Sequence, residues 1–333
     1  MLNRFHIKDY RCLRDVQGEL TPLHAFIGPN DSGKSSILRA LGDLVNQLGN
    51  RERAPLPNTG QPLVVGWFNR SSEGNVTRAQ ARYERDSSRW WLQFDDPGPN
   101  QLDRDEQAYE LGGIGRSALI RLDPDQLRQP SSLLTEQEIG EFPQRRGHEL
   151  AGVYDAILSR GDDTFQRISQ QVRVLFPSVA GLRLDAIDSS RKVLGARLAD
   201  GTVIRAEHMS EGLLYYLAYA ALVEVNGASL LLVEEPENGL HPSRILEIMG
   251  LLRHLSERGT QVLIATHSPL VINELQPHEV SVVTRSVATG TCVTPIAGTQ
   301  RFAERAEVYA LGELWLSYAN GVDEAPLLHG MAP

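Results

Sequence analysis

Residues 28–35 carry the feature that most constrains the fold, because Gly-Pro-Asn-Asp-Ser-Gly-Lys-Ser matches the phosphate-binding pattern GxxxxGK[ST] without a mismatch. A short apolar run at 24–27 precedes the match and predicts a buried strand, and the apolar spacing from 35 to 48 predicts a helix. In this context glycines let backbone N–H groups wrap a phosphate at the helix N-terminus. An accidental glycine-rich turn is the alternative, and the flanking patterns argue against it.

Each part of this loop has an expected contact. Lys34 is expected to reach the β- and γ-phosphates of a nucleotide, and the Ser35 hydroxyl is expected to ligate Mg²⁺. The predicted nucleotide-binding residues of the loop and the first helical turn are Gly28, Pro29, Asn30, Asp31, Ser32, Gly33, Lys34, Ser35 and Ser36.

A second signal combines a buried strand with carboxylates at its end. Residues 230–233 are four apolar residues, and Glu234 and Glu235 follow directly. Because ligands bind at the carboxyl edge of open α/β sheets, this edge is expected to face the nucleotide. Glu234 is predicted to hold the metal, and Glu235 to polarise or deprotonate the attacking water. A charged turn after a core strand is the alternative, which loses weight beside a complete phosphate loop.

Two further pieces depend on their position. His267 follows the apolar strand 261–265, one strand–helix unit after the carboxylates, so we expect it at the same sheet edge, within reach of a γ-phosphate. A structural hydrogen-bonding histidine is the alternative. Ser210 precedes an apolar helical run, where a serine is a good N-cap. Together with Gly212 it also predicts a helix N-terminus that presents N–H groups to an anion.

The order of elements predicts one discontinuous core. Residues 1–27 favour strands, and the region beyond 205 alternates helix and strand as in a mainly parallel sheet. The expected downstream elements are helix 211–225, strand 229–234, helix 243–257, strand 261–265, helix 269–274 and strand 279–284. The predicted domains are a nucleotide-binding core from 1–50 and 205–300, an inserted β-rich and helical lobe at 51–204, and a helical tail at 301–333.

Composition narrows the class of protein. The longest apolar runs are far shorter than the roughly 20 residues of a membrane span, and no signal peptide is visible. Two cysteines, Cys12 and Cys292, predict no disulfide framework, which favours a cytoplasmic protein. The net charge is −9 and the small cluster of Arg145, Arg146 and His148 favours a solvated loop, so composition gives no support for DNA binding by the isolated chain.

These motifs, in this order, resemble the ABC-type ATPases. Residues 28–35 resemble Walker A, 210–212 the signature loop, 230–235 Walker B, His267 the switch histidine and 237–241 the D-loop. Three sequence segments resemble the RecF/SMC-like branch, above all the ATPase domain of the OLD (overcoming lysogenization defect) family. They are residues 5–11, Glu-Glu-Pro-Glu-Asn-Gly-Leu-His-Pro and Ala-Thr-His-Ser-Pro.

The resemblance implies a fold and a mechanism. The fold is an α/β P-loop NTPase of ABC type, with a mainly parallel sheet, an N-terminal antiparallel β segment and a mixed insertion. The implied ligands are ATP and Mg²⁺. The implied assembly is a head-to-head homodimer in which Ser210 of one subunit meets the γ-phosphate held by the other. ATP turnover would then control a separate effector protein or a nucleic-acid transaction, as in anti-phage defence or DNA repair.

Some positions depart from the family pattern. The signature is Ser-Glu-Gly and the first Walker B acid is Glu rather than Asp, which leaves slow turnover open. Gln93 and Gln101 are candidates for the Q-loop glutamine. OLD-type nucleases carry a C-terminal TOPRIM nuclease domain. Only about 50 residues of this chain follow the last predicted strand, which is too few for such a domain, so none is expected in this chain. Trp315 lies on an apolar helical face in the tail, where packing on the core or docking of a partner are the alternatives.

Two other functions remain as alternatives to the effector-controlling ATPase. One is the nucleotide-binding subunit of an ABC transporter, but the sequence of residues 237–241 argues against it. The other is an ATP-gated clamp or scaffold with negligible hydrolysis. Glu235 argues against the clamp, because a clamp needs no carboxylate poised on the attacking water.

Overall fold

The structure is a computed structural model that describes residues 1–48, 62–69, 76–84, 89–95, 115–143, 146–299, 302 and 309–319. Its contacts divide the chain into two compact units. Unit 1 comprises Met1–Leu119, Ser229–Pro236 and Ser256–Pro333, and unit 2 comprises Ile120–Ala228 and Glu237–Leu255. Among the helices of the described residues, none has both the length and the apolar character of a membrane span.

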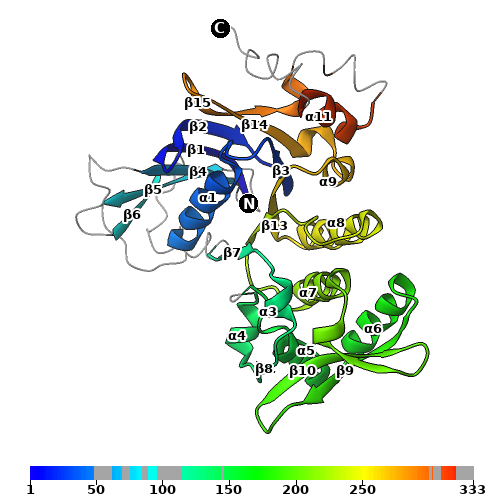
Figure 1. Cartoon of the computed structure of the whole chain (residues 1–333). Coiled ribbons are helices and arrows are strands. Elements are labelled where there is room, and N and C mark those ends of the chain that lie inside the picture. Colours follow the sequence, from blue (N-terminus) through cyan, green and yellow to red (C-terminus); the bar gives the residue numbers. More distant parts are fainter. Residues whose placement is uncertain are drawn as a thin grey trace. The chain divides into compact units, whose positions relative to one another are not determined.

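Unit 1 contains a six-stranded sheet with the order β15-β14-β3-β13-β12-β7 (Figure 1). Strands β14, β3, β13 and β12 run parallel, and β15 is antiparallel to β14. The bounds are β3 Leu23–Ile27, β7 Ser117–Ile120, β12 Leu230–Glu234, β13 Gln261–Thr266, β14 Val280–Ser286 and β15 Gly290–Pro295. Every residue of β3 and β13 is buried, as expected of strands covered on both faces.

A second, five-stranded antiparallel sheet in unit 1 has the order β2-β1-β4-β5-β6. Its strands are β1 Leu2–Tyr10, β2 Leu13–Glu19, β4 Leu63–Asn69, β5 Val76–Glu84 and β6 Arg89–Asp95. Helix α1 (Lys34–Leu48) contacts strands of both sheets, and its apolar face joins one core with side chains of each, such as Phe5, Val64 and Leu232. Unit 1 also holds α9 (Pro269–Asn273), α11 (Leu311–Ala319) and the short helices η2 (Pro277–Glu279) and η3 (Ile296–Gly298).

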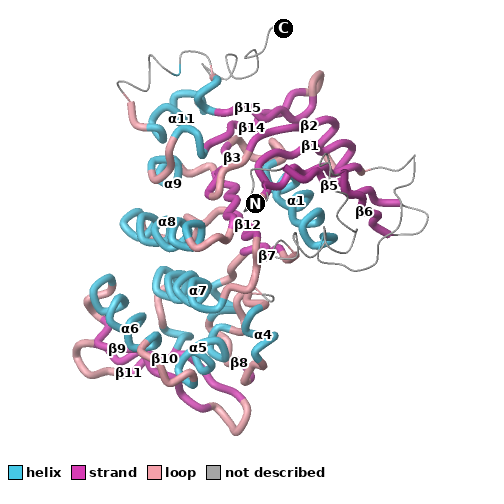
Figure 2. Tube along the Cα trace, turned by 180° about the vertical axis from the view of Figure 1, so that it is seen from behind, coloured by secondary structure: helices cyan, strands magenta, loops and turns pink. Residues whose placement is uncertain are grey.

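Unit 2 combines helices with a small antiparallel sheet, in which β10 pairs with β8, β9 and β11. Figure 2 shows α5 and α6 lying against β9 and β10, which they also contact. The bounds are α3 Pro124–Leu127, β8 Ser131–Ser132, α4 Glu136–Gly140, α5 Leu150–Ser159, α6 Thr164–Leu175, β9 Val179–Ala186, β10 Arg191–Leu198, β11 Val203–Arg205, η1 Ala206–His208, α7 Glu211–Val225 and α8 Pro242–Glu257. The last residues of α8 belong to unit 1.

The mixed α/β class, the parallel strands and the N-terminal antiparallel segment confirm the predicted fold class. The compact units, however, follow other boundaries than the predicted domains. Strand β4 hydrogen-bonds to β1, which places part of the predicted insertion at 51–204 in unit 1. Helix α7, predicted in the core, lies in unit 2, where Tyr154 of α5 donates a hydrogen bond to its Leu217 carbonyl. Pairing between distant segments, rather than position along the chain, decides these boundaries.

Candidate active site

The parallel strands of unit 1 end level with one another, and this register creates the site. Glu234 of β12 lies opposite Ala265 of β13, and Thr266 of β13 lies opposite Ile27 of β3. The chain leaves these strands at Glu235, His267 and Gly28, respectively. The register therefore brings the two carboxylates, the histidine and the phosphate-loop motif to one carboxyl edge, where open α/β sheets bind ligands.

The phosphate-loop motif joins β3 directly to α1. Lys34, the first residue of α1, is only 6% exposed, and its Nζ donates hydrogen bonds to the carbonyl oxygens of Gly28 at 2.7 Å and Pro29 at 2.9 Å. A Cβ at Gly28 would lie 2.2 Å from the Val283 carbonyl oxygen of β14, so only glycine fits there. The loop is thus closed around its own lysine at the N-terminus of a 15-residue helix.

The hairpin of β14 and β15 holds this loop from outside. Thr291 Oγ1 donates a buried hydrogen bond of 2.9 Å to the Ser32 carbonyl, and Arg285 reaches the Asp31 carbonyl at 3.4 Å. Asp31 and Gly33 have φ values of 63° and 111°, in the left-handed region that glycine adopts without strain and that aspartate tolerates better than most residues. The hairpin therefore supports the curved backbone that a phosphate cradle requires.

A cavity of about 430 Å³ lies beside the same loop. The loop contributes residues 29–32, the N-terminal sheet contributes Cys12 and Arg14, and the β14–β15 hairpin contributes Arg285. This volume falls within the range of small-molecule sites. Two arginines and Asp31 lie in its wall.

Glu234 is the better-buried carboxylate of the pair. Its side chain is 11% exposed, and Arg39 of α1 approaches its Oε1 to 3.8 Å. That oxygen accepts no hydrogen bond within the described residues. A buried carboxylate oxygen that lacks a hydrogen-bond partner, beside the helix that carries Ser35, suits a hard divalent cation, so these residues fit Mg²⁺.

Glu235 has an unusual backbone, with φ of 47°. Its N–H donates to the Ala265 carbonyl at 2.8 Å, and its Oε2 lies 2.7 Å from His267 Nδ1. The Glu235 side chain is 24% exposed and that of His267 is 56% exposed. A non-glycine residue held at positive φ is costly and is found often at active sites. The turn at Glu235 therefore brings its carboxylate within ion-pair distance of the His267 imidazole.

The predicted signature residues lie in unit 2, at the start of α7. Ser210 is exposed, and its Oγ accepts a hydrogen bond of 3.4 Å from the Leu213 N–H, so it caps the helix as predicted. Glu211, the first helical residue, lies 3.8 Å from Arg128. A Cβ at Gly212 would meet nothing within 4 Å. The N-terminus of α7 is thus open to solvent.

Ser36 and the two candidate glutamines are the remaining predicted residues. Ser36 lies in the first turn of α1, where its Oγ is 3.4 Å from Cys12 Sγ. Gln93 lies on β6, paired with Gln80, and Gln101 lies outside the described residues. Sequence patterns missed Arg39, Thr291 and Arg285. Each comes from a segment without a motif, and the last two are separated from the loop by more than 250 residues.

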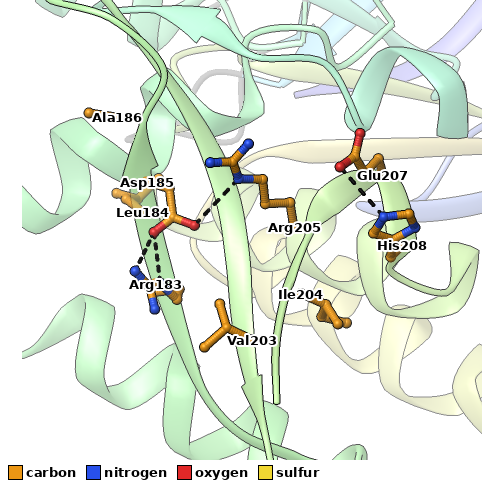
Figure 3. A pocket seen from close by; sticks show the side chains of 9 residues that line it. All are labelled: Arg183, Leu184, Asp185, Ala186, Val203, Ile204, Arg205, Glu207 and His208. Carbon is orange, nitrogen blue, oxygen red and sulfur yellow. Dashed lines mark hydrogen bonds and ion pairs between the residues drawn. The ribbon is translucent and has the colours of Figure 1, made fainter.

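A larger cavity, of about 750 Å³, lies in unit 2 against β9, β11 and η1. Figure 3 shows Arg183 and Arg205 directed toward Asp185 from two sides, at 2.6 and 3.9 Å. His208 lies 3.5 Å from Glu207. The charged groups in this wall are paired with one another, so the cavity has no excess positive charge for a phosphate.

Two family models match this chain. The family described as "AAA domain, putative AbiEii toxin, Type IV TA system" matches residues 71–273, more than half of the chain. A second model, an AAA ATPase domain, matches residues 1–86, which include the phosphate loop.

Two known proteins are similar to parts of this chain. An OLD nuclease of Thermus scotoductus is 53% identical over 45 residues, which is 14% of this chain and 8% of that protein. An ABC transporter ATP-binding/permease protein of Mycobacterium tuberculosis is 24% identical over 209 residues, 58% of this chain and 23% of that protein. The chain therefore spans less than a quarter of the length of these two relatives.

Among solved structures, an SMC head bound to the C-terminal winged-helix domain of ScpA resembles this chain with a TM-score of 0.62 at 16% identity. The match covers 88% of this chain and 96% of the SMC head. At this identity the likeness shows the fold alone. A short stretch of the chain is thus similar to an OLD nuclease, its fold is that of an SMC head, and by the match over residues 71–273 the chain belongs to the AAA domain family named above.

Proposed function

We propose that this chain binds Mg-ATP at the phosphate loop of unit 1 and hydrolyses it. The observation that carries the proposal is the common strand edge at which Lys34, Glu234, Glu235 and His267 meet. The 430 Å³ cavity beside the loop supplies space for the nucleoside, with Arg14 and Arg285 in its wall. Membership of an ATPase family supports the same activity.

In this mechanism the loop N–H groups and Lys34 hold the phosphates, and Lys34 exchanges its two carbonyl partners for phosphate oxygens. Ser35 and Glu234 would hold Mg²⁺, which when bound offsets charge on the β- and γ-phosphates. Glu235 accepts a proton from the attacking water while the water oxygen forms a bond to the γ-phosphorus. The bond to the bridging oxygen breaks, and ADP and inorganic phosphate leave. His267, 2.7 Å from Glu235, orients that carboxylate and the γ-phosphate.

The open N-terminus of α7 supports a second part of the proposal, a homodimer closed by two ATP molecules. Helix α7 is buried along most of its length, yet Ser210 and Glu211 at its start are exposed. A helix N-terminus with accessible N–H groups is an anion site. In the dimer, Ser210 and Gly212 of one protomer meet the γ-phosphate held by Lys34 of the other.

The output of this dimer is proposed from resemblance alone. Closure and reopening would control a separate effector protein or a nucleic-acid transaction in the cytoplasm, in anti-phage defence or DNA repair. The OLD nuclease relative suggests a nucleic-acid setting, and the SMC head bound to ScpA shows that a protein of this fold holds a protein partner.

Turnover tests the proposed hydrolysis, and mass in solution tests the proposed dimer. Glu235→Gln should bind Mg-ATP but turn over at least about a hundredfold more slowly, because the proton acceptor is lost. Light scattering behind a sizing column should then show a dimer with Mg-ATP and a monomer without it. A wild-type protein that binds ATP without measurable turnover would refute hydrolysis and leave the ATP-gated clamp.

The matched control places a bulky cation at the open helix N-terminus. Glu235→Gln combined with Ser210→Arg should still bind ATP but stay monomeric, because Ser210 acts only on the partner's nucleotide. If the mass never changes although ATP binds, the sandwich model is wrong for the isolated chain.

A transporter subunit is the second candidate, favoured by the match to the ATP-binding/permease protein. It predicts co-purification with a membrane protein and turnover that depends on that protein. Turnover by the isolated chain, in the absence of membranes, would argue against it.

A further inference from the structure

The C-terminal helix α11 packs against the turn that carries His267. The Trp315 indole Nε1 donates a hydrogen bond of 3.1 Å to the His267 carbonyl, and the Gly312 N–H donates one of 2.7 Å to Asn273 Oδ1 at the end of α9. A Cβ at Gly312 would lie 2.2 Å from the Pro269 carbonyl oxygen. Leu314 and Trp315 are buried, at 1% and 4% exposure. Helix α11 is therefore tightly packed against the turn that carries His267.

The peptide unit between His267 and Ser268 is held at both ends. Its carbonyl oxygen accepts from Trp315, and its N–H, on Ser268, donates to Thr266 Oγ1 at 2.9 Å. Thr266 is fully buried at the end of β13. Because a peptide unit is planar, two hydrogen bonds at opposite ends determine its rotation.

That rotation sets the direction in which the imidazole points. The His267 ring is more than half exposed, so packing does little to hold it, yet Nδ1 lies 2.7 Å from Glu235 Oε2. The Glu235 backbone is itself held by its hydrogen bond to Ala265, two residues before His267. The relative position of carboxylate and imidazole thus depends on the backbone at 265–268.

We propose that Trp315 is a positioning residue for His267, and that α11 thereby adjusts the rate of hydrolysis at the proposed site. The inference rests on the proposed ATPase function and adds a residue that no motif includes. Trp315 touches neither nucleotide nor metal. It acts by fixing the His267 peptide, so a displacement of α11 would lower turnover while leaving nucleotide affinity unchanged.

Trp315→Phe in the full chain is the test, because phenylalanine fills most of the space of the indole but has no N–H donor. We expect kcat for ATP to fall about tenfold, since small misplacements of catalytic groups have large effects on rate. KM for ATP should stay within about twofold. Trp67→Phe, which alters a tryptophan of the antiparallel sheet beside Arg4, is the matched control and should leave both constants unchanged.

A double variant separates positioning from general loosening. In a His267→Ala background, Trp315→Phe should cause no further loss of kcat beyond about twofold, because the group it positions is gone. An equal loss in both backgrounds, a parallel rise in KM, or an unchanged kcat in the single variant would overturn the inference.

Thr266→Val provides an independent test of the other end of the same peptide. It removes the acceptor for the Ser268 N–H and leaves Trp315 untouched, so kcat should fall in the same direction as for Trp315→Phe. If Trp315→Phe does not fold, this variant decides, and an unchanged kcat contradicts the inference. The proposed function is tested separately: a wild-type protein without ATP turnover would refute it, whereas the ratios of kcat between variant and wild type test only the positioning role of Trp315.

Discussion

Two helix N-termini in this molecule suit an anion, and they differ in their surroundings. Helix α1 begins at Lys34, a buried lysine held by two loop carbonyls, and its first turn has no acidic residue. Helix α7 begins at Glu211 behind an exposed Ser210 cap. The first lies in a complete cradle within its own unit, whereas the second has an open N-terminus and a carboxylate that opposes an approaching anion.

The difference indicates a division of labour between the two helices. The α1 site is suited to bind a nucleotide alone, because lysine, loop and cavity all belong to unit 1. The α7 site is suited to recognise an anion that is already held elsewhere, because Ser210 and Glu211 at its start are exposed. Open space around Gly212 leaves room for such an approach.

Removing Lys34 should have the largest effect. Lys34→Met is expected to weaken ATP binding about thirtyfold or more, because loss of a buried, hydrogen-bonded charge costs about 2–5 kcal/mol. Titration with a fluorescent ATP analogue measures the change in Kd. The control is Arg128→Met, which removes a cation beside Glu211 at the other helix and should leave Kd unchanged. Equal effects of the two substitutions would contradict the division of labour.

The two glycines should respond differently to an added methyl group. Gly28→Ala places a methyl 2.2 Å from the Val283 carbonyl oxygen and should lower the free energy of unfolding by about 2 kcal/mol. Gly212→Ala meets nothing within 4 Å and should leave thermal stability unchanged or slightly higher, since alanine favours helix. Thermal melts compare the two. Gly212→Ala should weaken only the ATP-dependent dimer, and a loss of stability there would show that its own chain requires the glycine.

Acid should weaken the unit that carries α1 through a buried histidine. His24 lies on β3, hydrogen-bonds Ser281 at 3.0 Å, and burial lowers its pKa from 6.5 to about 4. Between these values the unfolded chain takes up a proton that the native state does not, so stability is full above about pH 6.5 and falls as pH decreases toward 4. From pH 7 to 5.5 we expect a loss of about 1 kcal/mol.

Chemical denaturation at both pH values measures this loss. His24→Gln removes the titrating group and should lose about 1 kcal/mol less than the wild type over the same interval. His208→Gln, at an exposed histidine of unit 2, is the matched control and should behave like the wild type. An equal pH dependence in all three proteins would show that His24 does not set it.

The sequence predicted the strands and helices of the site well because their signals are local. The apolar runs of β3, β12 and β13 and the pattern of 28–35 lie within a few residues of each other, and the fold class was confirmed. The roles of Glu235, His267 and Ser210 stay predictions, because coordinates show where a side chain lies and not what it does to a nucleotide.

Other features depend on contacts that no local pattern encodes. Strand β15 was not predicted, although its Thr291 holds the phosphate loop across 259 residues. The short elements α3, β8 and α4 lie within the inserted lobe predicted at 51–204, where none of the three was predicted. The predicted tail helix was consistent with either packing or docking, and the buried Trp315 with its bond to His267 shows packing. Amphipathic spacing reveals that a face is apolar, and only the folded chain shows what covers it.

The smallest predicted effect concerns the one acidic residue that distinguishes the two helix starts. Glu211→Gln removes a negative charge from the first turn of α7, where a charge contributes about 0.3–1 kcal/mol. In the free protein this charge stabilises the helix, but facing a γ-phosphate it repels, and Arg128 at 3.8 Å offsets it only in part. We therefore expect a slightly less stable monomer and an ATP-dependent dimer that is about twofold to fivefold tighter, measured by light scattering across a dilution series in the Glu235→Gln background. A weaker dimer would mean that Glu211 makes a favourable contact with the partner, and that the α7 N-terminus recognises more than the phosphate charge.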